Sequence, residues 1–95
     1  MFAVLGAGGS AVAQNAQMLQ LRTLAATCAS CHGTDGRTVP GSAIPALAGL
    51  PASYIAAQMT AFKDGSKPAT VMAQIAKGFS PEQINALAAY FAGIR

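Results

Sequence analysis

The pentapeptide Cys28-Ala-Ser-Cys31-His32 constrains the fold of this chain more than any other feature. It contains both cysteines and the single histidine of the sequence. Two thiols on one helical turn can reach the two vinyl groups on one edge of a porphyrin, while the next residue directs an imidazole at the iron. The spacing C-x-x-C-H is accordingly typical of haem c attachment. The sequence therefore predicts one covalently bound haem, held by Cys28 and Cys31, with His32 as the proximal iron ligand.

Two other uses of a cysteine pair are weaker interpretations. A thioredoxin-like redox pair belongs at the start of a helix in a βαβ unit, and the rest of the sequence predicts no strands. A structural zinc site needs four Cys or His ligands, more than this chain possesses. A haem-free dithiol or disulfide module stays as a rival, and it would show titratable thiols and no Soret absorbance.

Composition restricts the other classes of protein. The 95 residues are 53% hydrophobic and only 9% charged, with a net charge of +3, which fits one small domain. The longest apolar stretch, residues 1–13, is shorter than the ~20 residues of a bilayer-spanning helix, so we expect no stable membrane span. A scattered surplus of positive charge does not favour nucleic-acid binding, which needs a dense Lys/Arg face.

Residues 1–13 resemble the rear of a secretory signal peptide. This apolar run ends in the small residues Ala11-Val12-Ala13, directly before polar Gln14, although no Lys or Arg precedes Arg22. We therefore expect an exported, periplasmic protein with residues 1–13 as a signal-peptide remnant and residues 14–95 as the domain.

The apolar spacing in the remaining chain predicts an all-α domain of about four helices. Helical periodicity runs from about residue 16, with Met18 on the apolar stripe, into the cysteine pair, and again over residues 51–64, 70–77 and 81–94. Ser80-Pro-Glu-Gln is a capping box at the start of the last helix. Residues 33–49 carry four Gly and two Pro without periodicity, and so long a loop usually wraps something. A core this small usually needs a disulfide, a metal or a buried cofactor to stabilise it, and a covalent haem would meet this need.

At this point the sequence resembles the class I c-type cytochromes over residues 17–95, essentially the whole domain. It is most similar to the single domains of dihaem periplasmic cytochromes and to the haem subunit of flavocytochrome c sulfide dehydrogenase. The resemblance implies a class I cytochrome c fold, with the haem enclosed by the helices and the long loop. It also implies that the Pro45 carbonyl accepts the proton of the other His32 nitrogen. The motifs that carry it are Cys28-Ala-Ser-Cys-His-Gly33, Pro45-Ala-Leu-Ala-Gly49, residues 54–65, Met72-Ala-Gln-Ile-Ala-Lys-Gly-Phe-Ser80 and Leu87-Ala-Ala-Tyr-Phe91.

The sixth iron ligand is expected to be Met72. With one histidine in the chain, a second protein ligand is most readily a thioether. Met1 lies in the presumed signal, and Met18 lies on the helix that leads to Cys28, so neither is favoured as the ligand. Met59 lies on an apolar stripe, where a methionine is usually core, and it is the next candidate. Met72 lies 40 residues after His32, far enough to reach the opposite haem face, and the resembled family has its axial methionine here.

These ligands predict single-electron transfer in the periplasm rather than enzymatic activity. An iron with both axial positions filled leaves no site for a substrate, and the three acidic side chains show no pairing for acid/base work. The expected partners are redox proteins. Three roles stay open: a free carrier, a haem subunit bound to a flavoprotein in a sulfide dehydrogenase complex, and a five-coordinate gas-binding sensor.

The polar surface near the expected haem is less defined. Lys63, Lys67 and Lys77 flank the Met72 segment, where they either form a basic rim for an acidic partner or simply end helices. Arg37, Tyr54 and Gln58 are the polar groups considered first for the haem propionates.

Overall fold

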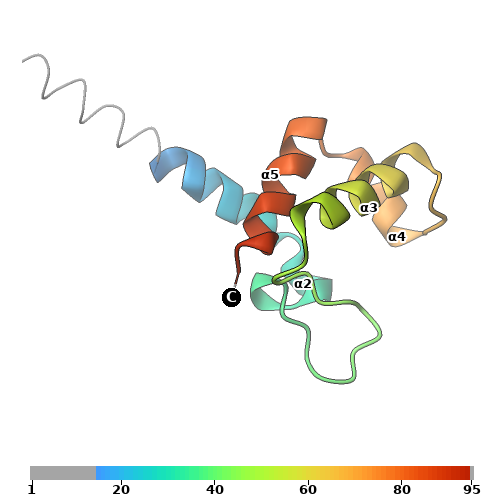
Figure 1. Cartoon of the computed structure of the whole chain (residues 1–95), viewed down its shortest axis with the longest axis horizontal. Coiled ribbons are helices and arrows are strands. Elements are labelled where there is room, and N and C mark those ends of the chain that lie inside the picture. The colour runs from blue at the N-terminus through green and yellow to red at the C-terminus, as the bar shows by residue number, and fades with distance from the viewer. Residues whose placement is uncertain (1–14, 95) are drawn as a thin grey trace, which may run out of the picture.

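The computed structural model describes residues 15–94, which form helices and loops and contain no strand. A first helix covers residues 15–26. It is followed by the single turn α2 (Ala29–His32), the 3₁₀ turn η1 (Thr34–Gly36), α3 (Ala52–Asp64), α4 (Val71–Lys77) and α5 (Pro81–Ala92). Figure 1 shows the first helix extending to one side of the body that α3, α4 and α5 form. The expected signal-peptide remnant, residues 1–13, lies outside the described residues.

Local signals fix both ends of α3 and the start of α5, as predicted. Pro51 directly precedes α3, and Gly65 follows it with φ 86°, the left-handed conformation that favours glycine. At α5, Ser80 Oγ accepts from the Gln83 N–H, and Gln83 Oε1 accepts from the Ser80 N–H. Both bonds of the capping box are therefore present.

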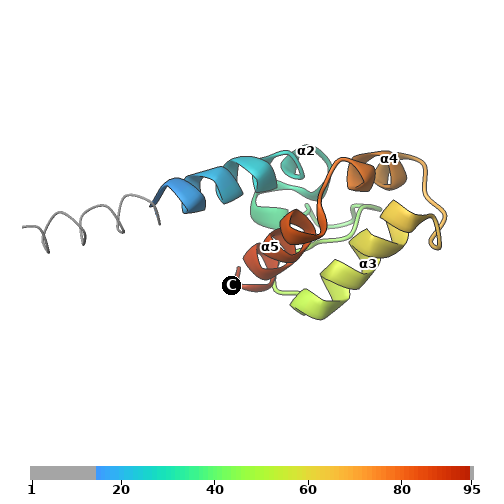
Figure 2. The same cartoon turned by 90° about the horizontal axis from the view of Figure 1, so that it is seen from above.

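The first helix ends at residue 26, so the expectation that it continues into the cysteine pair was wrong. The N–H groups of Thr27 and Cys28 donate to the carbonyls three residues earlier, at 3.2 and 3.0 Å. The Thr27 hydroxyl also donates to the Leu24 carbonyl at 2.7 Å. Bonds of this kind tighten the last turn and end the α-helix. The pentapeptide therefore begins a new turn, α2, which follows directly on the end of the first helix (Figure 2).

The long loop is fastened at Gly36. The Gly36 carbonyl accepts from the N–H groups of Leu47 and Ala48, at 2.8 and 3.2 Å. Gly49 N–H then donates to the carbonyl of Phe91 on α5 at 2.9 Å. The loop therefore leaves and returns at one place, and the chain between these points projects from the body (Figure 1).

The hydrophobic core is small and lies where α3 packs against α4 and α5. Met18 is not part of it: this side chain is 53% exposed, because the beginning of the first helix projects beyond the body (Figure 1). Within residues 15–94 no helix is both long and apolar enough to cross a membrane. The buried core residues are Ala25, Ile55, Met59, Ala76, Ile84, Leu87, Ala88 and Phe91.

Candidate haem-attachment site

Both cysteines are free thiols on one short stretch of chain. Cys28 precedes α2 and is half-buried, while Cys31 lies within α2 and is exposed. Burial raises the pKa of the Cys28 thiol above its ordinary value, because desolvation disfavours the thiolate, and a hydrogen bond with the Thr27 side chain acts in the opposite direction. Neither sulfur is tied up in a disulfide, so both are available for thioether bonds.

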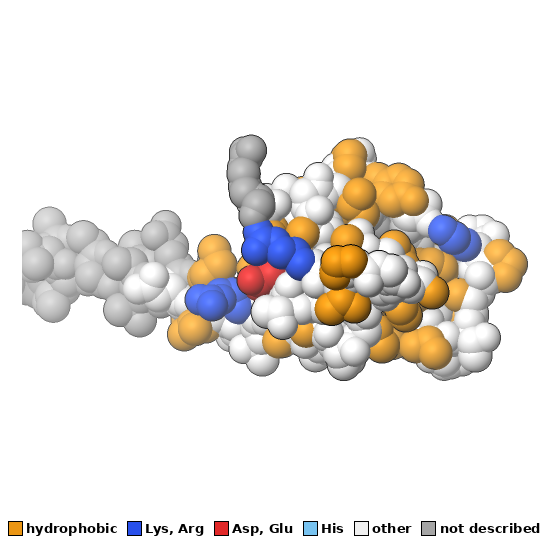
Figure 3. Space-filling model, turned by 90° about the horizontal axis from the view of Figure 1, so that it is seen from below, with side chains coloured by type: hydrophobic (Ala, Val, Ile, Leu, Met, Phe, Trp, Pro, Cys, Tyr) orange, Lys and Arg blue, Asp and Glu red, His pale blue; other side chains and the backbone are white. Residues whose placement is uncertain are grey.

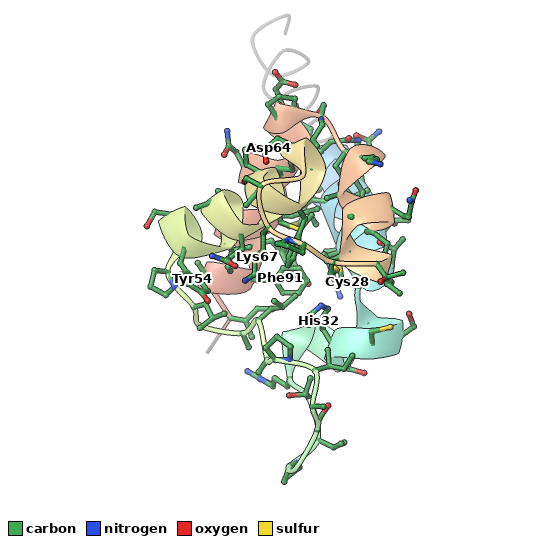
Figure 4. The ribbon with its side chains drawn as sticks, turned by 90° about the vertical axis from the view of Figure 1, so that its right-hand side faces the viewer. Cys28, His32, Tyr54, Asp64, Lys67 and Phe91 are labelled. Carbon is green, nitrogen blue, oxygen red and sulfur yellow. The ribbon has the colours of Figure 1, made fainter. Side chains whose placement is uncertain are left out.

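The imidazole of His32 is held in one orientation by the long loop. Its Nδ1 lies 2.7 Å from the carbonyl oxygen of Pro45. A carbonyl can only accept, so Nδ1 carries the proton and Nε2 presents its lone pair, which is the form that binds iron. In Figure 4 the ring points from α2 toward the side on which α3 and α4 lie, with Cys28 nearby.

Gly33 makes this geometry possible, because the chain turns sharply after His32. Gly33 has φ 85° and ψ 161°, and its N–H donates to the Ala29 carbonyl at 3.0 Å. A Cβ at this position would lie 2.2 Å from the carbonyl oxygen of Arg37. No side chain fits there, so glycine is required for the loop to come back to His32.

The two candidate methionines lie in different surroundings. Met59 on α3 is a core residue with 9% exposure. Met72 is the second residue of α4, is half-buried and packs at the margin of the core. The structure thus brings Pro45 and His32 together and carries Met72 on a separate element that packs against α3.

The donor set fits a haem better than a bare metal ion. Among residues 15–94, no group of three or more His, Cys, Asp or Glu side chains could hold a metal ion. A turn with two free thiols and one oriented imidazole instead matches a group that brings its own four nitrogen ligands and two vinyl substituents. Two grooves beside the first helix and α5 are lined by none of Cys28, Cys31 and His32, so they are not part of this site.

The lysines around the Met72 segment are only in part a free rim. Lys63 is half-buried and its ammonium donates to the carbonyl of Phe79, while the Lys67 ammonium donates to Gln58 Oε1. Gln58, considered above for a propionate, is therefore bound to a lysine. Lys77 is exposed. On the face seen in Figure 3, hydrophobic side chains are more widespread than charged ones, and most of the charged ones gather beside the first helix.

Sequence reasoning missed two long-range contacts of the fold. Lys63 contacts Phe79, which lies 16 positions away in the sequence. The Gly36 carbonyl accepts from Leu47 and Ala48, which lie 11 and 12 positions away, and these bonds close the long loop. The only sequence signal was the run of glycines with no periodicity, which marks the loop without saying where it closes.

Comparison with known proteins finds a family model and several relatives of this chain. A family model described as Cytochrome c matches residues 20–94. The cytochrome subunit of sulfide dehydrogenase from Chlorobaculum tepidum is 42% identical over 71 residues, which are 75% of this chain and 63% of that protein. The thiosulfate dehydrogenase electron acceptor from Thiomonas intermedia is also 42% identical over 71 residues, 75% of this chain but 33% of that protein.

The fold also has a close counterpart among solved structures. Cytochrome c4 from Acidithiobacillus ferrooxidans superposes with a TM-score of 0.66 at 39% identity, covering 70% of this chain and 38% of that one. The chain thus spans 33% to 63% of the length of these relatives. The all-α fold class expected from the sequence is confirmed.

Proposed function

The chain belongs to the cytochrome c family, whose members bind haem c covalently, and on this premise we propose that it transfers single electrons through one haem. Cys28 and Cys31 would form the thioether bonds, and His32 and Met72 would be the axial ligands. The haem supplies an iron that cycles between the ferrous and ferric states. The protein holds the ligands in place, excludes water and presents the haem edge to redox partners.

The observation that carries the proposal is the hydrogen bond between His32 Nδ1 and the Pro45 carbonyl. It fixes the tautomer and ring orientation in advance, and it raises the basicity of Nε2 toward an iron. The same turn presents two free thiols, so attachment and ligation come from one local unit. A histidine of ordinary structural purpose would not need to lie in this arrangement.

Met72 is the preferred sixth ligand. It is half-buried on α4, whereas Met59 is a buried member of the core, where a methionine is usually a packing residue. A His/Met pair raises the reduction potential and fills both axial positions, which favours electron transfer over binding of small molecules. The sequence holds a single C-x-x-C-H motif, which supports one haem in this chain.

The names of the relatives suggest the biological setting. One is an electron acceptor of a thiosulfate dehydrogenase and another is the cytochrome subunit of a sulfide dehydrogenase. We propose that this chain likewise accepts electrons from a dehydrogenase in the periplasm, either as a free carrier or as a subunit bound to a flavoprotein. Stable co-purification with a flavoprotein after export would favour the subunit role, whereas a monomer reduced by several donors would favour the carrier.

The test is an optical and electrochemical comparison of three holoproteins exported through a haem-attachment pathway: wild type, Met72→Leu and Met59→Leu. Leucine conserves the volume of methionine but cannot bind iron. We expect the far-red band of a methionine–ferric iron bond in the wild type and in Met59→Leu, and its loss in Met72→Leu. The reduction potential of Met72→Leu should fall by roughly tenths of a volt, within the ~0.8 V range that axial ligands span.

Other outcomes separate the alternatives. A band lost only in Met59→Leu would move the ligand to Met59. No such band in any of the three proteins, together with a spectral change when carbon monoxide is added to the reduced wild type, would favour the sensor. A chain that acquires no haem during competent export would overturn the proposal and leave the dithiol module.

A further inference from the structure

Lys63 makes a partly buried contact with a distant part of the chain. It lies in the last turn of α3, is half-buried, and directs its ammonium to the carbonyl of Phe79, in the connection between α4 and α5. A lysine can complement a helix dipole from an exposed position in the last turn, without a bond to another element. Here the cation is partly withdrawn from water to bind a carbonyl that lies beyond the end of α4.

The opposite end of the same segment is also tied to α3. Lys67 N–H donates to the Ala61 carbonyl at 3.1 Å, and its ammonium contacts Gln58 and lies 5.2 Å from the centroid of the Phe62 ring. Residues 67–79 therefore form a span that is fastened to α3 at both ends, and Met72 lies between the two fastenings.

Helix α4 needs such external support. It has only seven residues, and Thr70 at its N-cap makes no side-chain capping bond. An isolated helix of this length is not stable in water, so its position depends on tertiary contacts. Of the lysine contacts at the two ends, that of Lys63 is partly buried while that of the Lys67 side chain is exposed. A charge-assisted bond is stronger where water competes less, so Lys63 is the more important anchor.

We propose that Lys63 is a positioning residue that holds α4 so that the Met72 thioether stays on the iron, an inference that rests on the proposed role of Met72 as axial ligand. Lys63 does not touch the haem in this scheme. It would restrain the carbonyl of Phe79 and with it the end of α4, and so keep Met72 close to its position as a ligand.

The test measures how well free imidazole competes with Met72 for the ferric iron. Each holoprotein is titrated with imidazole, and binding is monitored by the optical spectrum. In Lys63→Met the apolar stem is kept and the donor is lost. We expect imidazole to bind this variant about tenfold more tightly than the wild type, the effect of one lost charge-assisted hydrogen bond. Lys63→Arg keeps a cationic donor and should restore most of the wild-type affinity. If Lys63→Met does not accumulate as folded holoprotein, Lys63→Leu, which also has no donor, replaces it with the same expectation.

Lys77→Met is the matched control. It also removes one positive charge, here from the last turn of α4, but Lys77 is exposed. Its imidazole affinity should stay within about twofold of the wild type, the scale of a surface charge effect. If Lys63→Met binds imidazole no more tightly than Lys77→Met, Lys63 has no positioning role and the inference is overturned.

Met72→Leu in the same titration distinguishes the two levels of the argument. If it binds imidazole more tightly than every other variant, Met72 is the ligand, and the results for Lys63 can be judged on their own. If Met72→Leu and the wild type bind imidazole equally, the ligand assignment fails, and the inference about Lys63 fails with it.

Discussion

Gly36 meets two demands that no residue with a side chain could meet together. It is buried with φ 73°, and a Cβ there would lie 2.9 Å from Phe91 Cδ1, 3.0 Å from Leu47 Cβ and 3.1 Å from Ala48 N. The left-handed conformation and the overpacking both oppose a side chain. We expect Gly36→Ala to lower the free energy of unfolding by about 2–4 kcal/mol, measured by urea denaturation of the holoprotein.

Gly41 provides the control for this comparison. It has φ 84°, similar to that of Gly36, but nothing lies within 4 Å of the position of a Cβ. Gly41→Ala should therefore cost only the conformational part, about 1–2 kcal/mol. Equal losses in the two variants would mean that the loop moves away from α5 without penalty, and that Gly36 does not fasten it.

At the level of single residues, the chemistry could be predicted from the sequence but its support could not. The C-x-x-C-H motif is contiguous, so its meaning does not depend on the rest of the fold. The contact of His32 with Pro45 spans 13 positions and was expected only through a resemblance to a family. The contacts of Gly49 with Phe91, and of Lys63 with Phe79, depend on how loops close in space, and no local pattern encodes that.

Among the helices, α5 has the clearest start signal, and its contribution can be measured. Ser80 Oγ accepts from the Gln83 N–H at 3.1 Å. Removal of this hydroxyl would leave the Gln83 N–H without its capping partner. We expect Ser80→Ala to lower the free energy of unfolding by about 1 kcal/mol. Ser53→Ala, at an exposed position in the first turn of α3, should change it by less than about 0.5 kcal/mol. Similar values for both serines would show that the capping box does not stabilise α5.

The helices that were predicted well are those with local start and stop signals. Pro51 and Gly65 bound α3, Gly78 follows α4, and the capping box opens α5. The first helix was predicted too long because its apolar periodicity continues through Cys28. The interruption comes from the backbone N–H groups of residues 27 and 28, which donate to carbonyls three residues earlier instead of four. Periodicity describes which face would be buried if the helix continued, and it does not say whether it does.

The molecule as a whole has a small hydrophobic core. Three of the eight buried core residues are alanines, and no large side chain of residues 15–94 is fully buried. Val71 and Ile75 of α4 are 60% and 39% exposed. In small domains a cofactor, metal or disulfide usually supplies the missing apolar contact, and both cysteines here are free.

The haem should therefore be required for cooperative folding as well as for electron transfer. We expect the chain made without haem attachment, with its thiols reduced, to lose the single cooperative melting transition seen by far-ultraviolet circular dichroism, because burial against the porphyrin is absent. The same chain with haem attached is the control and should melt in one step. If the haem-free chain melted just as cooperatively and at a similar temperature, the eight-residue core would suffice by itself, and the role of the haem would be confined to redox chemistry.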